Sequence, residues 1–208
     1  MKILVLGASG KVGRLVVEDA LNRGHKVHAL VHSDSLNDQP NLKVYKGDIY
    51  DPDSINKALA GVDVVISCLG SWGTKHKNVV STGIENIVPL AKKHKINRIV
   101  TLTGHGARAP AEKLDLVASI SRNILKIAAS KILYDGEKSL EELHRTKLDW
   151  VGLRSPIMVN FFEPSRFEFS SKRPWPLSII NRKSVAIALL DLAEANKIDN
   201  KVPFIKRG

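Results

Sequence analysis

The opening segment of the chain places a short apolar run directly before three glycines spaced three residues apart. The apolar run is Ile3 to Leu6, and the glycines are Gly7, Gly10 and Gly13. A short continuous apolar run is expected of a strand buried on both faces of a parallel sheet. After the glycines, apolar residues recur at helical spacing as far as about Gly24. The start of the chain therefore predicts a buried strand, a tight turn and an amphipathic helix.

The same alternation continues along the chain. Further strands are expected at 26–31, 42–45, 62–67, 98–102 and 148–153, and helices at 52–60, 78–94, 114–145 and 183–195. The longest helix is expected to break around 135–136. Strands that alternate with helices indicate βαβ units with right-handed crossovers. The sequence therefore predicts an α/β fold, a doubly wound Rossmann domain with a mainly parallel sheet and helices on both faces.

We find no repeat, low-complexity tract or linker, so residues 1–208 are expected to form one domain. The stretch 156–176 is rich in proline and phenylalanine and is expected to be irregular, and a segment of about 156–180 is expected to cover a substrate. A short strand at 202–205 would be confined to a sheet edge by Pro203, which lacks an N–H. The helix at 183–195 could pack on the sheet or on a second subunit.

The glycine turn has the chemistry of an anion site. Gly7 permits a tight exit from the strand, Gly10 permits close approach of a pyrophosphate, and Gly13 permits close packing of the helix. A phosphate-binding P-loop does not fit, because Val12 stands where that motif needs Ser or Thr. The alternative is a strand–helix turn that binds nothing. We expect a dinucleotide on this turn, with the following candidate contacts: Gly7, Ala8, Ser9, Gly10, Lys11, Val12 and Gly13.

Further motifs carry a family resemblance that covers nearly the whole chain. They are the Gly-x-x-Gly-x-x-Gly turn, Gly47-Asp48-Ile49, Leu69-Gly70, Arg98-Ile99-Val100 leading to Thr103, Leu148-Asp149-Trp150, and Arg154-Ser155-Pro156. With these the chain resembles the atypical short-chain dehydrogenase/reductase family, in the branch of biliverdin reductase B/flavin reductase and NmrA-like proteins. The resemblance implies an NAD(P) cofactor.

The resemblance also implies where that cofactor lies. Asp48 and Ile49 would flank the adenine, and Cys68, Leu69 and Gly70 would line the ribose–phosphate path. Thr103 and Pro156 would complete the cofactor contacts. For Asp48, a helix or turn cap is an equal alternative.

The second expected strand ends without the carboxylate that usually holds the ribose of NAD. It ends Val31-His32-Ser33, with Asp34 two residues after His32. His32 and Ser33, with Lys11 or Arg14, could contact a 2′-phosphate. This pattern favours NADP(H), with NAD(H) possible. The family more often has Arg at the position of His32, so weaker or pH-dependent affinity is expected; the alternative is that His32 is simply exposed.

Candidate catalytic residues lie in the middle of the chain, between 103 and 138. Tyr134 and Lys138 have the spacing of the family's acid pair, which one helix face would hold together. Counting back from residue 148, the family's usual position falls nearer Lys131 and Asp135, so an ordinary helix pair is the alternative. Thr103 matches a hydroxyl expected near the nicotinamide, whereas Gly104 stands where the family has serine, and alcohol oxidation is therefore not favoured.

Hydride transfer to a planar acceptor needs less protein machinery than alcohol oxidation. His105 could donate a proton, or be a loop histidine without a role. An aromatic segment could cover a flat substrate or close the core, with Trp72 and Gly73 opposite; its members are Phe161, Phe162, Phe167, Phe169 and Trp175. We therefore predict an NAD(P)H-dependent oxidoreductase that passes hydride to a flavin, quinone or similar planar acceptor. The alternative is a non-catalytic NAD(P)-sensing regulatory protein of the NmrA-like type.

Charge and composition limit the classes of partner that are expected. The net charge is +11, but the basic clusters lack interleaved aromatic residues, so we expect a solvated basic surface, with attraction of anionic phosphates as the next alternative. RNA binding is a third hypothesis that rests on charge alone, and the expected partner is a small planar substrate. No apolar stretch could span a bilayer, so no membrane partner is expected. The single cysteine, Cys68, suits a cytoplasmic protein. No metal-ligand spacing and no hydrolase elbow are present, and a monomer or homodimer remains open.

Overall fold

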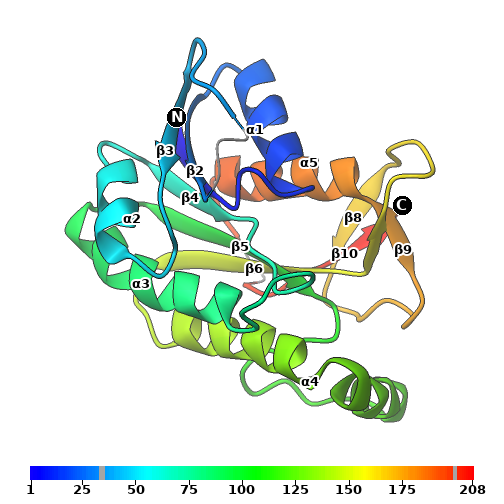
Figure 1. Ribbon diagram of the computed structural model, residues 1–208. Helices are drawn as coiled ribbons and strands as arrows, with labels where there is room; N and C mark the ends of the chain where they lie inside the picture. Colours follow the sequence, from blue (N-terminus) through cyan, green and yellow to red (C-terminus); the bar gives the residue numbers. More distant parts are fainter. Residues whose placement is uncertain (33–35, 199–200) are drawn as a thin grey trace.

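The computed structural model describes residues 1–32, 36–198 and 201–208. Its centre is an eight-stranded sheet of order β3-β2-β1-β4-β5-β6-β10-β8 (Figure 1). Seven strands are parallel, and β8 pairs antiparallel with β10. Their bounds are β1 Lys2–Leu6, β2 Lys26–Val31, β3 Leu42–Lys46, β4 Val64–Ser67, β5 Arg98–Gly104, β6 Asp149–Ser155, β8 Phe167–Ser170 and β10 Phe204–Arg207. The remaining strands, β7 (Ile157–Val159) and β9 (Ile179–Asn181), form a separate parallel pair.

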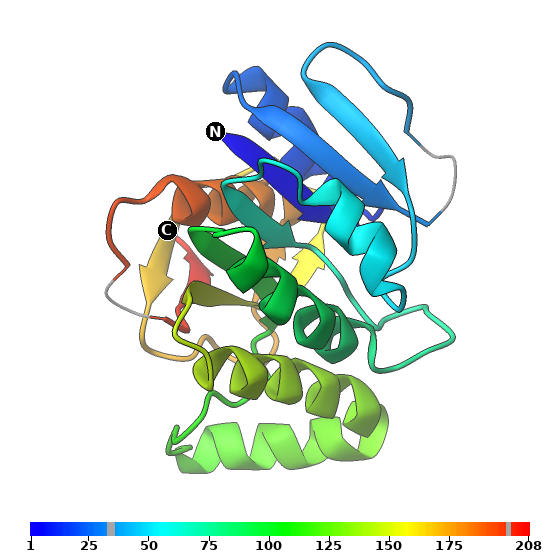
Figure 2. The ribbon, with the colours of Figure 1, turned by 90° about the vertical axis from the view of Figure 1, so that its left-hand side faces the viewer.

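Helices cover both faces of the sheet (Figures 1 and 2). On one face lie α1 (Gly13–Asn22) and α5 (Arg182–Glu194); on the other lie α2 (Pro52–Ala58), α3 (Val79–Lys93) and α4 (Leu116–His144). The alternation of side chains along β1 explains the two layers, because Ile3 and Val5 join the core under α1 and α5 while Leu4 and Leu6 join the core under α2, α3 and α4. The predicted α/β fold with a mainly parallel sheet and helices on both faces is confirmed.

The carboxyl-terminal strand corrects one expectation. Pro203 does not confine β10 to the edge, since β10 pairs with β6 on one side and β8 on the other. Pro203 directly precedes the strand, so its missing N–H removes no bond between strands, and its carbonyl accepts the Arg154 N–H at 2.9 Å. The edge is instead β8, which comes from the stretch expected to be irregular. That expectation failed because β8 is stabilised by pairing with a segment more than 30 residues later in the chain.

The structure corrects the expected bend in α4 and decides where α5 packs. The bend in α4 lies at Ala129 (φ −150°, ψ 41°) and not at 135–136. Gly136 continues the helix, and its lack of a side chain serves close packing, since an ideal Cβ there would lie 2.5 Å from Thr103 Oγ1. The final helix α5 packs on the sheet, with Val185 and Leu189 fully buried. No helix within the described ranges is long and apolar enough to cross a membrane.

Candidate functional site

The glycine turn joins β1 to α1 and is held by its own backbone. Gly7 has φ +72°, and the Gly10 N–H donates to the Gly7 carbonyl at 2.9 Å. An ideal Cβ on Gly13 would lie only 2.1 Å from the Gly7 oxygen and 2.9 Å from the Ala8 Cα. The turn can therefore take this shape only with glycine at position 13, because both obstructing atoms belong to the backbone.

The amino end of α1 is open to an anion. The Val12 cap makes no side-chain hydrogen bond, and the first turn holds no acidic residue. In the parts of the chain that are described, the N–H groups of Lys11 and Val12 have no protein acceptor. Arg14 Nε donates to the Ser9 carbonyl at 3.0 Å, which keeps a cation beside the turn. Free N–H groups, the helix dipole and two exposed cations together suit a pyrophosphate.

The end of β4 meets the glycine turn. An ideal Cβ on Gly7 would lie 3.1 Å from the Cys68 carbonyl oxygen and 3.3 Å from the Leu69 nitrogen. Gly70 has open space around it. Burial raises the pKa of the Cys68 thiol to about 12, so the thiol is protonated at neutral pH and is no nucleophile. Cys68 and Leu69 therefore border the glycine turn, and Gly70 directly follows them.

The tip of β2 brings together two residues predicted to contact the cofactor. His32 is exposed, and its Nε2 lies 3.5 Å from Asp48 Oδ2. Asp48 also accepts the Tyr50 N–H at 3.0 Å, so it caps a turn as well as facing His32. Ile49 beside it is buried, and its carbonyl accepts from Asn86 at 2.7 Å. Ser33 lies outside the described residues.

Thr103 and Gly104 end β5 at the same edge of the sheet. Thr103 is buried against Gly136 of α4, whereas Gly104 is exposed with open space around it. Pro156, which follows β6, is buried. Because carboxyl ends of parallel strands meet at one edge, the glycine turn, the end of β4 and Thr103 line one continuous edge.

His105 follows Gly104 and is fixed on both sides. Its N–H donates to the Ser155 carbonyl at 2.7 Å, and its carbonyl accepts from Arg173. Burial, and then the charge of Arg173, lower the pKa of the imidazole. Residues of α4 and Pro174 enclose a cavity of only about 10 Å³ beside it. A larger cavity of about 280 Å³ lies at the amino ends of β1 and β2, away from this edge.

A partly buried charge cluster holds the segments around His105, and sequence reasoning missed it. Glu112 lies 2.6 Å from Arg154 Nη1 and 3.2 Å from Arg173 Nη2. The Arg154 guanidinium carbon lies 3.6 Å from the centre of the Phe204 ring. The partners of Glu112 lie 42 and 61 residues along the chain, so no local pattern could have indicated the cluster.

Tyr134 and Lys138 lie on α4, and the structure does not join them to Thr103. Tyr134 is exposed, and Lys138 Nζ lies 2.5 Å from Glu85 Oε1 on α3. The hydrogen bond from this ammonium to Glu85 is the main cause that raises the pKa of Lys138. Among the described side chains, no hydrogen bond links either residue to Thr103.

Asp135, near which the resemblance implied the family's catalytic position, is fully engaged in the fold. Its carboxylate accepts the Val80 N–H at 3.0 Å, the Ser81 N–H at 2.8 Å and the Ser71 hydroxyl. It therefore caps α3 from another helix and holds the loop after β4. Sequence reasoning missed this contact, because the cap and its helix lie 54 and 55 residues apart.

The aromatic segment divides between the core and the surface. Phe161, Trp175 and Trp72 are exposed, and Phe167 packs against the core. Phe167 and Phe169 lie on β8 with ring centres 5.6 Å apart. In the described residues, no three His, Cys, Asp or Glu side chains could hold a metal ion.

Comparison with known proteins assigns the chain to a family. A family model described as NAD(P)H-binding matches residues 7–196. The 2-alkyl-3-oxoalkanoate reductase of Stenotrophomonas maltophilia is 33% identical over 130 residues, which cover 55% of this chain and 38% of the relative. The chain spans about a quarter to two fifths of the length of the curated relatives that it matches.

Solved structures extend the likeness to the whole fold. ChuY, an anaerobillin reductase from Escherichia coli O157:H7, superposes with a TM-score of 0.80 at 21% identity, covering 100% of this chain and 97% of that one. A short-chain dehydrogenase/reductase from Veillonella parvula, solved with NADP, gives 0.78 at 14% identity, covering 99% and 94%. The family model, which matches most of the chain, shows that this chain belongs to the NAD(P)H-binding family, and the solved structures show that it shares their fold.

Proposed function

We propose that this chain is an NADPH-dependent reductase that passes hydride directly to a small planar acceptor such as a flavin or a quinone. The observation that carries the proposal is the continuous edge formed by the glycine turn, the end of β4 and Thr103. At one end it offers the N–H groups of Lys11 and Val12, and at the other the open space around Gly104. The first suits a pyrophosphate, and the second leaves room for an acceptor ring.

The residues at the tip of β2 support NADP(H), with NAD(H) possible. The described part of that tip holds no carboxylate of its own, and His32 is exposed there. A protonated imidazole could donate to a 2′-phosphate, with Lys11 and Arg14 nearby in the turn. Asp48, 3.5 Å from His32, competes for the same imidazole and would weaken this contact.

The nicotinamide would supply the hydride, and the chain would align the two rings and exclude water. We place the acceptor over Gly104, with the segment of about 156–180 on one side and Trp72 on the other. Thr103 and Pro156 would border the nicotinamide. Tyr134 and Lys138 remain proposed contributors whose engagement would require Lys138 to leave Glu85.

A second candidate function is a non-catalytic NAD(P) sensor. Gly104 provides no hydroxyl, Tyr134 points to solvent, and Lys138 is held by Glu85. These observations favour binding without turnover. They agree with a protein that binds NAD(P) and passes hydride to no acceptor.

The test measures NADPH oxidation with free flavin and with a soluble quinone, beside NADPH and NADH titrations by fluorescence. Turnover well above the acceptor-free rate, lost in Gly13→Ala, supports the reductase. Tight NADPH binding without turnover on any acceptor would favour the sensor. If neither nucleotide binds, both candidate functions are refuted.

A further inference from the structure

The first half of α4 carries an exposed apolar stripe that nothing in the fold covers. The outer stripe consists of Leu116, Val117, Ile120, Ile124 and Ile127. The exposed fractions are 53% for Ile120, 63% for Ile124 and 89% for Ile127. Spacings of three and four residues place these side chains on one side of the helix. Exposed β-branched residues in a continuous row mark an interaction surface.

The inner side of the same helix segment is already in use. Ala118, Ser121 and Leu125 line the small cavity beside His105. Beyond the bend at Ala129, the helix turns so that its later half packs on α3 and the sheet. In Figure 2 the first half of α4 forms the outermost layer of the molecule, below the second half. The outer stripe is therefore the side directed away from the body.

An ion pair holds this segment in place across the bend. Arg122 Nη2 lies 2.7 Å from both carboxylate oxygens of Glu137. The segment is thus tied to the later half of α4 by a bidentate contact, which fixes the direction of the stripe.

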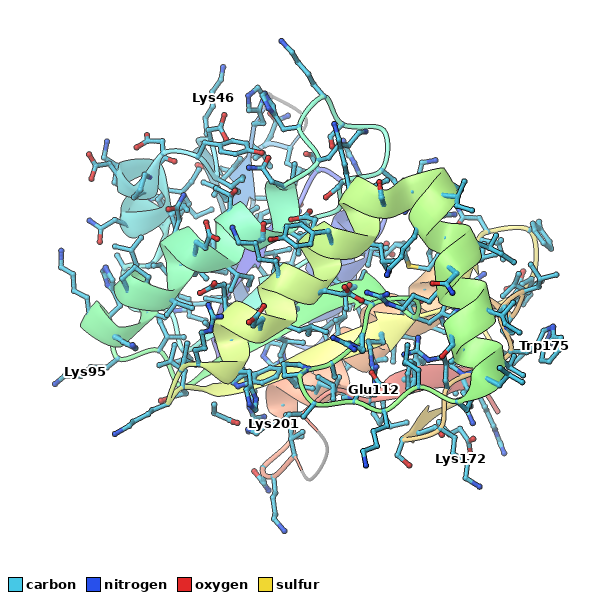
Figure 3. All side chains as sticks on the ribbon, turned by 90° about the horizontal axis from the view of Figure 1, so that it is seen from below. Lys46, Lys95, Glu112, Lys172, Trp175 and Lys201 are labelled. Carbon is cyan, nitrogen blue, oxygen red and sulfur yellow. The ribbon has the colours of Figure 1, made fainter. Side chains whose placement is uncertain are left out.

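The stripe continues onto the neighbouring loop. Pro174 and Pro176 line the same cavity as the inner side of α4, and Trp175 and Leu177 are exposed beside them. Figure 3 shows Trp175 next to the first half of α4, with Lys172 close by. A tryptophan that has one side in water and the other against apolar groups is typical of a membrane–water interface.

The charged side chains between Leu116 and Tyr134 are all positive. From Leu116 to Tyr134 the sequence has no acidic residue, and the net charge of the chain is +11. Lys126 and Lys131 are exposed and have no acidic partner among the described residues. Asp115, at the start of the helix, is engaged in capping the Ala118 N–H.

We propose that the outer stripe, with Trp175 and Leu177, docks on an anionic lipid surface, the helix lying in the plane of the interface without crossing it. An amphipathic helix with apolar residues on one side and lysines at its flank has this behaviour. Anionic headgroups complement Lys126 and Lys131, whereas the same surface of a second copy would present the same lysines. This inference does not rest on the proposed reductase activity.

Docking would also place the proposed reaction edge next to the lipid. The inner side of the docking helix encloses His105, which follows Gly104 at the carboxyl end of β5. An apolar planar acceptor dissolved in the lipid would then have a short path to this edge.

The test is co-sedimentation of the full chain with vesicles of phosphatidylglycerol and phosphatidylcholine in equal parts, against vesicles of phosphatidylcholine alone. We expect binding to the anionic vesicles that weakens as ionic strength rises. Ile124→Ser and Ile127→Ser should each weaken it about tenfold, and Lys126→Gln and Lys131→Gln about fivefold each. Ile157→Ser, which changes an exposed isoleucine outside the stripe, is the matched control and should change binding by less than about twofold.

Circular dichroism and NADPH titration report separately on folding and on the cofactor site, so a vesicle result cannot be confused with failure of the proposed function. Three outcomes would overturn the inference. These are no binding to anionic vesicles at low salt, equal binding to both vesicle types, or equal loss in Ile157→Ser and the stripe variants. A dimer in light scattering that Ile124→Ser abolishes would also overturn it and would assign the stripe to a second copy.

Discussion

Replacing Asp135 with alanine removes the carboxylate that ties the amino end of α3 and the loop after β4 to α4. Asp135 is 1% exposed and accepts hydrogen bonds from Ser71, Val80 and Ser81. An unpaired buried donor costs about 1–3 kcal/mol. Three donors that share one acceptor group do not add fully, so we expect Asp135→Ala to lower the free energy of unfolding by about 3–5 kcal/mol. For a chain of this length that corresponds to a fall in melting temperature of roughly 10 °C.

The variant Asp135→Asn shows how much of this stability depends on the second carboxylate oxygen. The amide keeps one acceptor oxygen but turns an NH₂ group toward a second donor, so we expect a loss of about 2 kcal/mol. The matched control is Asp51→Ala at the start of α2, where an exposed carboxylate accepts the Asp53 N–H at 3.0 Å. An exposed cap of this kind costs about 1 kcal/mol.

Urea unfolding followed by circular dichroism measures all three variants, with NADPH titration on the folded fraction. If Asp135→Ala costs no more than Asp51→Ala, the carboxylate does not hold the two helices as described. If Asp135→Asn keeps full stability but loses turnover, Asp135 has a catalytic role and the structural interpretation is wrong.

Three further predictions concern the site and the acid limb of stability. Gly13→Ala should lower the free energy of unfolding by about 1–3 kcal/mol and weaken NADPH binding in fluorescence titration, because the added Cβ would lie 2.1 Å from the Gly7 oxygen. Its control is Gly104→Ser, whose side chain enters open space and should leave the melting temperature unchanged. His32→Arg should tighten NADPH but not NADH by about tenfold, because the guanidinium can bind a phosphate with two hydrogen bonds; equal effects on both nucleotides would contradict this. For Asp149, burial raises the pKa, but hydrogen bonds from two neighbouring cations outweigh it and hold the pKa below its ordinary value. The stabilising contribution of the ionised Asp149 carboxylate is therefore present above about pH 4 and lost as the pH falls further. In urea titrations, the difference in unfolding free energy between wild type and Asp149→Asn should shrink toward about pH 2. A difference that stays constant with pH would contradict this prediction.

Much of the amino-terminal part of the fold was predictable, because its signals are local. The apolar run before Gly7, the helical spacing after Gly13 and the second strand at 26–31 each depend on neighbours within a few residues. β1, α1 and β2 were found close to the expected positions. The glycine turn was predictable for the same reason.

The carboxyl-terminal part of the fold was less predictable, because contacts between distant segments build it. The pairing of β8 with β10, the cap that Asp135 supplies and the cluster around Glu112 all join residues far apart in sequence. Propensity and spacing carry no information on such partners.

The sequence by itself determined the layered α/β architecture and the glycine turn, since burial patterns and glycine sterics act over a few residues. Only the tertiary structure decided that Lys138 binds Glu85, that Asp135 serves the fold, and that the first half of α4 turns its isoleucines outward. Each of these depends on which side of a helix meets a distant neighbour. Packing of the whole chain fixes that choice, because a helix can satisfy its own hydrogen bonds whichever side it buries.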